Sequence, residues 1–250
     1  MRGRGFFLIL ATMTLLLSML SIYSAYYMYI LSDRGPRDLG VSNAKVVADD
    51  FRRALEASLI IASQNFYDEF TRSGDLGRAY SSATLEASKF IQQWVGNVTY
   101  AYSGFDLYVN TSITLQFNWI GTGGEWYSMI NGSLTINATS LGRCVSNLNV
   151  TVGLKVERAS IFVESLPGKR FRIYMNVTAV DVYRGVGVPL DVVKIVVDGR
   201  EFYDAESYIY YGGGLNYFTV LTRERDKRVD TVEGYFSYNG VIVRVFIALS

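Results

Sequence analysis

The stretch NVTVGLKV, residues 149–156, indicates the fold class of most of this 250-residue chain. Every second position in it is apolar: Val150, Val152, Leu154 and Val156. Successive side chains of a β-strand point to opposite faces of its sheet. The alternation therefore predicts a strand with one face in a core and the other toward solvent.

The same two-residue period recurs on both sides of that stretch. Apolar and polar residues alternate in residues 113–119, 133–139 and 171–178. Additional strands are expected near residues 208–211 and 216–222. A series of short strands with no helices between them predicts an antiparallel sheet structure rather than a parallel α/β sheet.

Turn residues connect several of these strands. Asp198-Gly199 and Asn239-Gly240 lie between apolar runs, and both dipeptides favour the type I′ turn of a two-residue β-hairpin. Residues 97–250 are therefore expected to form one antiparallel β-sandwich.

Two amphipathic helices are expected ahead of the strands. The first runs from about Ser42 to Arg72, and its apolar residues recur at spacings of three or four: Val47, Phe51, Leu55, Leu59, Ala62, Phe66 and Phe70. The second ends at Gly96 and has a similar stripe: Leu76, Tyr80, Ala83, Ala87, Phe90, Ile91 and Trp94. The segment Ser73-Gly74-Asp75 separates the two helices. Such stripes predict packing on a core, and a partner or filament interface is the alternative.

The N-terminal region carries the pattern of a membrane span. An uncharged run, residues 6–31, follows Arg2 and Arg4. At about 1.5 Å per residue it is long enough to cross a hydrocarbon core of about 30 Å. The positive charge before the run places the N-terminus in the cytoplasm and the chain after residue 32 outside. The alternative is a cleaved secretory signal with a mature start near Ala25.

Six of the twelve asparagines lie in N-x-S/T sequons: Asn97, Asn110, Asn131, Asn137, Asn149 and Asn176. This pattern is the acceptor for N-glycosylation, which is typical of surfaces outside the membrane. Three of the six, at positions 137, 149 and 176, fall on the polar face of a predicted strand. The two patterns agree, and the sequence predicts a glycosylated extracellular protein.

Composition excludes several function classes. The chain has no histidine and a single cysteine, Cys144, which excludes a histidine-based triad, a histidine-bearing zinc site and an internal disulfide. Without a histidine base, Cys144 is expected to be a buried or idle thiol rather than a nucleophile. The formal net charge is only +1, so nucleic-acid binding is not expected.

The remaining candidate sites each have a simpler interpretation. Glu201, Asp204 and Glu206 form an acidic cluster suited to calcium, but no EF-hand-type spacing frames them, and a solvated hairpin edge is the alternative. The tyrosines of the segment YYGGG, residues 210–214, either face outward to bind sugar or pack inward beside a flexible connection. The mixed charges of residues 223–228 indicate a charged turn or an electrostatic partner contact.

The start of the chain resembles the class III signal of archaeal type IV pilins and pilin-like proteins. The resemblance is carried by a short basic leader ending in Arg4-Gly5, directly before a hydrophobic run that begins FFL. In that family a prepilin peptidase cuts after the glycine, which corresponds here to the bond between Gly5 and Phe6. The resemblance implies a hydrophobic helix in a filament core or in the membrane, and a β-rich head outside.

The chain departs from the family pattern at two places. Many pilins carry a glutamate where this chain has Leu10, and Gly35-Pro36 is expected to break a long continuous helix. A plain signal anchor without cleavage is the alternative.

These patterns together predict an α+β protein: an N-terminal transmembrane helix, two amphipathic helices, then an antiparallel β-sandwich head. The expected segments are a leader and membrane helix at 1–32, a helical stalk at 41–96 and an extracellular β-sandwich domain at 97–250. The expected partners are the lipid bilayer, through residues 6–31, and copies of itself or other pilin-like subunits.

The predicted function is that of a membrane-anchored, N-glycosylated structural protein, a pilin-like component of an archaeal surface appendage or secretion-type assembly. A membrane-tethered surface protein that binds glycan or an envelope-layer partner is the alternative. No cofactor, metal site or catalytic residue is predicted, and an enzyme is not expected. An ectoenzyme that uses paired carboxylates is the third hypothesis.

Overall fold

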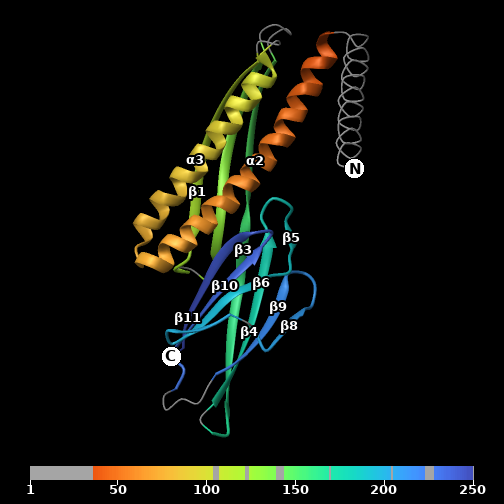
Figure 1. Cartoon of the computed structure of the whole chain (residues 1–250). Coiled ribbons are helices and arrows are strands. Elements are labelled where there is room, and N and C mark those ends of the chain that lie inside the picture. The colour runs from red at the N-terminus through yellow and green to blue at the C-terminus, as the bar shows by residue number, and fades with distance from the viewer. Residues whose placement is uncertain are drawn as a thin grey trace, which may run out of the picture.

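A computed structural model of the chain describes residues 36–103, 107–121, 124–138, 144–168, 170–203, 205–222 and 228–249, with side chains from residue 45 onward except at residues 107, 138 and 144–146. Two helices come first, followed by two antiparallel sheets (Figure 1). The protein is therefore an α+β protein. The hydrophobic run 6–31 lies outside the described residues. Among the helices that the structure describes, none combines the length and the apolar character needed to cross a membrane.

The helices form a hairpin. Helix α2 spans Pro36–Ser73 and α3 spans Leu76–Ala101. Proline at the first helical position has no backbone N–H to leave unpaired, so α2 begins at Pro36, six residues before the expected Ser42. Helix α3 continues five residues past Gly96, the expected end, because the glycine there does not adopt a terminating conformation.

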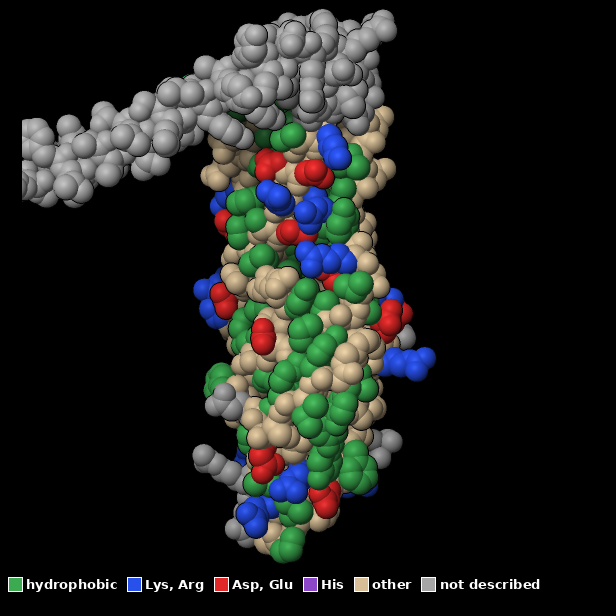
Figure 2. Space-filling view, turned by 90° about the vertical axis from the view of Figure 1, so that its right-hand side faces the viewer, with side chains coloured by type: hydrophobic (Ala, Val, Ile, Leu, Met, Phe, Trp, Pro, Cys, Tyr) green, Lys and Arg blue, Asp and Glu red, His purple; other side chains and the backbone are tan. Residues whose placement is uncertain are grey.

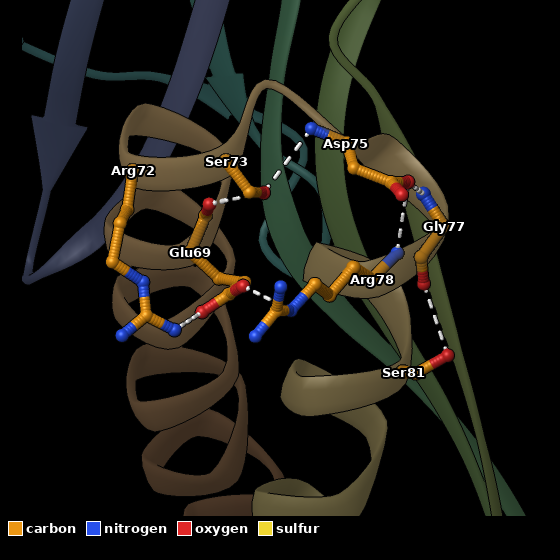
Figure 3. A network of polar contacts seen from close by, with 7 residues as sticks. All are labelled: Glu69, Arg72, Ser73, Asp75, Gly77, Arg78 and Ser81. Carbon is orange, nitrogen blue, oxygen red and sulfur yellow. Dashed lines mark hydrogen bonds and ion pairs between the residues drawn. The ribbon is translucent and has the colours of Figure 1, made fainter.

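The turn between the helices is held by a polar network (Figure 3). Gly74 has a φ of 66°, which ends α2, and Asp75 caps α3 by accepting hydrogen bonds from the N–H groups of Gly77 and Arg78. The largely buried Glu69 forms ion pairs with Arg72 and, at 2.7 Å, with Arg78. The expected stop and restart at residues 73–75 is confirmed.

The first sheet is long, and its strand order is β1-β2-β3-β4-β9-β8. Its strands are β1 (Leu107–Asn118), β2 (Trp126–Ala138), β3 (Cys144–Leu166), β4 (Arg170–Asp181), β9 (Leu215–Leu221) and β8 (Ser207–Tyr210), and the short β5 (Val186–Gly187) pairs with β4. Strand β3 has 23 residues and pairs with β2 along its first half and with β4 along its second half. A register shift between Val156 and Arg158 marks the change of partner.

The second sheet is smaller, with the order β11-β10-β6-β7. Its strands are β6 (Asp191–Val197), β7 (Arg200–Phe202), β10 (Thr231–Tyr238) and β11 (Val241–Ala248). Both predicted hairpin turns are present: Asp198 and Asn239 have positive φ, as does the glycine after each. The predicted strands near 208–211 and 216–222 are confirmed as β8 and β9.

The molecule has two layers (Figure 1). The long sheet forms one layer; α2 and α3 cover one half of it, and the second sheet covers the other half. Helix α2 contacts β2, β3 and β11, so it meets both sheets. A sandwich of two sheets thus accounts for only part of the β-structure, because helices cover the rest.

One hydrophobic core runs through both halves. The ring centroids of Phe66 on α2 and Phe117 on β1 are 4.4 Å apart. Between the two sheets, the rings of Phe218 and Phe236 stack with their centroids 4.8 Å apart. The predicted α2 stripe is buried from Val47 to Phe66. Alanines at 79, 83 and 87 form most of the buried face of α3, which lets the two helices approach closely.

Candidate glycan-bearing face of the long sheet

Five of the six sequon asparagines lie on strands of the long sheet: Asn110 on β1, Asn131 and Asn137 on β2, Asn149 on β3 and Asn176 on β4. Their neighbours in sequence, such as Ile136, Val150 and Met175, are buried in the core. Since adjacent residues of a strand point to opposite faces, all five asparagines lie on the face directed away from the helices and the second sheet. We call this the outer face.

The six sequon asparagines differ in exposure. Asn110, Asn149 and Asn176 are exposed on the outer face, and Asn97 is exposed on α3. Asn131 and Asn137 are half-buried. In a strand, the asparagine and the hydroxyl residue two positions later share a face, so N-x-S/T is also the spacing that a Ser/Thr/Asn-rich polar face produces by itself.

Hydrogen bonds connect the sequons across neighbouring strands. The hydroxyl groups of Ser112 and Ser133, the third residues of two sequons, lie 2.7 Å apart. Thr151, the third residue of the Asn149 sequon, donates to Asn131 Oδ1 at 2.6 Å. The register that pairs Ser112 with Ser133 and Asn131 with Thr151 produces these contacts. Three sequons therefore form one cross-strand polar ladder.

The part of the outer face that holds this polar ladder carries no charged residue. Strands β1 and β2, and β3 as far as Leu154, contain no Lys, Arg, Asp or Glu. An uncharged polar surface offers hydrogen bonds and stays hydrated, but it gives no electrostatic attraction to an ionic partner. It is suited to carrying neutral sugar.

The other half of the outer face carries a row of aromatic rings. Phe162 on β3 lies 5.8 Å from Tyr174 on β4, and Tyr174 lies 6.0 Å from Tyr217 on β9. Tyr211 continues the row, 6.5 Å from Tyr217. Phe162 and Tyr211 are 65% and 64% exposed. We call these four residues the aromatic row.

Apolar exposure extends to the edge strand β8. Figure 2, which views the side where β8 lies in Figure 1, shows hydrophobic side chains gathered over the lower half of the molecule. The exposed residues of β8 include Tyr208, Ile209 and Tyr210. A contiguous apolar patch of this kind marks an interaction surface more often than an idle one.

A separate cluster of ionisable residues lies where α2 meets the second sheet. The Lys194 ammonium donates to Glu201 at 2.7 Å and lies over the rings of Tyr67 and Tyr235. Burial disfavours its charge, but Glu201 and the two tyrosines leave the pKa of Lys194 above its ordinary 10.5. Lys194 therefore stays protonated at neutral pH and is not a nucleophile.

The pKa values of two neighbours of Lys194, Glu201 and Tyr235, are also shifted away from neutral pH. Hydrogen bonds from Lys194 and Tyr203 hold the pKa of Glu201 below its usual 4.5. Burial raises the pKa of Tyr235 to about 12. The cluster thus has fixed protonation states near neutral pH, which suits a structural junction better than acid–base catalysis.

The structure does not bring the predicted acidic cluster together. Glu201 pairs with Lys194, whereas Glu206 pairs with Arg172 at 3.4 Å on the other sheet. Asp204 lies outside the described residues, among which no group of three potential metal ligands occurs. Residues 223–227, the Cys144 side chain, and Gly5 and Phe6 also lie outside them.

The inward-packing alternative for the tyrosines of segment 210–214 is wrong. Tyr211 is 64% exposed, and Tyr210 keeps its ring at the surface while its hydroxyl donates to the carbonyl oxygen of Gly187 at 3.2 Å. Sequence reasoning also missed Phe162, Tyr174 and Tyr217 as a group. The alternation placed Tyr174 on the polar face, but only the strand register shows that the others join it.

The chain matches no protein-family model, no curated protein and no solved structure.

Proposed function

We propose that this chain is an N-glycosylated extracellular structural protein. The observation that carries the proposal is the position of the sequons: five share the outer face of one sheet, four of them on its uncharged part, and the sixth is exposed on α3. Glycan on these residues would cover a layer whose opposite side forms the core. Shielding the head, rather than catalysis, is the role that this arrangement supports.

The N-terminal pattern supplies the rest of the proposal. The run 6–31 anchors the protein in a membrane with the N-terminus in the cytoplasm, and cleavage between Gly5 and Phe6 would release a pilin-like subunit. Helix α2 begins at Pro36, so the helical segment follows the run after only a few residues. The proposed role is a pilin-like component of an archaeal surface appendage or secretion-type assembly.

A second candidate function is favoured by the aromatic row. Exposed rings beside polar groups are typical of surfaces that bind sugar or protein. Under this hypothesis the chain is a membrane-tethered binding protein for a glycan or an envelope-layer partner, and its N-terminus is uncut.

Peptide mass spectrometry on native envelope fractions tests both parts. We expect glycan on at least three of the six sequons and a mature start at Phe6. The absence of glycan from all six sequon asparagines would overturn the proposal that the chain is an extracellular glycoprotein. A mature start at Met1 or Arg2 would exclude the pilin-like subunit in favour of the tethered binding protein, and a start near Ala25 would exclude any membrane anchor.

A further inference from the structure

We infer that the glycan on Asn176 packs its first sugar on the ring of Tyr217, so that the protein's own glycan covers the centre of the aromatic row. The inference rests on the proposed glycosylation and names the surface that one of the glycans contacts.

Strand register places the acceptor beside the rings. Asn176 on β4 lies directly opposite Tyr217 on β9, and Tyr174 precedes Asn176 by two residues on the same face. Directly opposed residues of antiparallel strands have Cβ atoms about 4.5–5.5 Å apart. The exposed Asn176 amide thus lies within one sugar's reach of two aromatic rings.

The chemistry of the two partners matches. One face of a pyranose ring is lined with C–H groups that carry slight positive charge, and an aromatic face carries negative charge. Packing them together also removes apolar area of the row from water. Because the sugar is covalently tethered, contact does not require a separate binding event, and its effective concentration is high.

Polar groups border the aromatic row on the side of Tyr174 that is away from Asn176. Tyr174 donates its hydroxyl hydrogen to Glu164 at 2.7 Å, and Arg172 pairs with Glu206 beside it. These side chains offer both acceptors and donors at the rim of an apolar surface. Such a combination of ring face and polar rim is suited to a saccharide rather than to a purely apolar partner.

The outer face contains its own control. Asn149 is also exposed, but it lies opposite Ser133 and has no aromatic residue across the strand pair. A glycan there has only the polar ladder beneath it. The effect of losing the Asn149 glycan should therefore not depend on Tyr217.

A double-mutant cycle on the full chain tests the inference, using protein from the native host and the midpoint of thermal unfolding. With Tyr217 present, we expect Asn176→Gln to lower the midpoint by about 2–4 °C, the shift that an aromatic contact gives in a chain of this size. In Tyr217→Val, which removes the ring but keeps a strand-forming residue, the same change should shift the midpoint by roughly 1 °C or less. Tyr217→Phe keeps the ring and should keep the full effect.

Two controls isolate the sugar. Asn149→Gln should give the same shift with and without the Tyr217 ring. Protein made without glycosylation should show a clearly smaller coupling between positions 176 and 217, limited to what the bare cross-strand pair contributes, and an equal coupling with and without glycan would overturn the inference. Equal effects of Asn176→Gln in the wild-type and Tyr217→Val backgrounds would overturn the inference while leaving the glycoprotein proposal intact. An unmodified Asn176 in the native protein would also overturn it, and the proposed function would fall as well only if all six sequons were bare.

Discussion

Ser128 on the long sheet donates its hydroxyl hydrogen to the backbone oxygen of Ile242 on the second sheet, at 2.6 Å, across 114 positions of sequence. The same hydroxyl oxygen accepts a hydrogen bond from Trp119 Nε1 at 2.9 Å. The N–H of Ile242 in turn donates to Ser63 Oγ on α2 at 3.2 Å. One buried chain of hydrogen bonds therefore joins α2 and both sheets at the point where the two halves of the molecule meet.

Ser128→Ala should destabilise the protein by about 1–3 kcal/mol. It leaves the indole N–H of Trp119 and the carbonyl of Ile242 buried without their partner. Urea unfolding followed by tryptophan fluorescence measures the loss. Ser81→Ala, which removes an exposed hydroxyl of α3 outside any sequon, is the control and should cost far less. An equal loss in the free energy of unfolding for the two variants would show that the buried hydrogen bonds of Ser128 stabilise the fold no more than an exposed hydroxyl does.

Gly132→Ala should destabilise by about 1–3 kcal/mol, because overpacking forces the helices away from the sheet. A Cβ at Gly132 would lie 2.6 Å from Leu55 Cδ1 and 2.9 Å from Phe51 Cζ on α2. The same substitution at Gly96, which is exposed on α3 with open space around it, should stabilise by about 1 kcal/mol. Gly132→Ala keeps the Asn131 sequon, so glycosylation does not confound the comparison. Urea unfolding should give changes of opposite sign in the free energy of unfolding for the two variants. A stabilising Gly132→Ala would contradict the close helix–sheet packing.

Glu201→Gln should lower stability at pH 7 by up to about 1 kcal/mol, because it leaves the buried Lys194 without its anionic partner. The pKa of Glu201 is depressed in the folded protein, so its contribution is present above its unfolded pKa and is lost as pH falls through the folded value. The difference between wild type and variant should therefore shrink between pH 7 and pH 3 when urea unfolding is measured at both. A difference that stays constant across that range would contradict the pairing.

Glycan occupancy should follow exposure. We expect Asn97, Asn110, Asn149 and Asn176 to carry glycan in a larger fraction of molecules than the half-buried Asn131 and Asn137. Asn131 also engages its side-chain oxygen with Thr151, which a transferase would have to disrupt. Site-resolved glycopeptide mass spectrometry measures each fraction. Highest occupancy at Asn131 or Asn137 would show that modification precedes formation of the sheet.

Much of the local structure was predictable because its causes lie close together in the sequence. Alternation in residues 149–156 predicted which side of β3 faces the core, and Asp198-Gly199 and Asn239-Gly240 predicted two hairpins that the structure contains. The start of α2 was missed because Pro36 was interpreted as a helix breaker, whereas at a first helical position it is favourable.

The candidate site was predictable only in part. The sequons and their polar side could be recognised from spacing, since a strand repeats every two residues. The acidic residues 201 and 206 looked like one group, but their carboxylates pair with residues of different sheets, Lys194 on the second sheet and Arg172 on the long sheet. The aromatic row could not be predicted, because Phe162, Tyr174 and Tyr217 come from three strands, and β5 to β8 lie between the last two of these strands in the sequence.

The sequence by itself determined the two amphipathic helices, the main strands, the two hairpin turns and the polar face on which the sequon asparagines 137, 149 and 176 lie, because these depend on residues within a few positions of one another. Only the tertiary structure decided that helices cover half of the long sheet and a second sheet the other half, and that Asn176 lies opposite Tyr217. Those relationships depend on strand order and register. They are set by how the apolar faces of distant segments can all be buried at once.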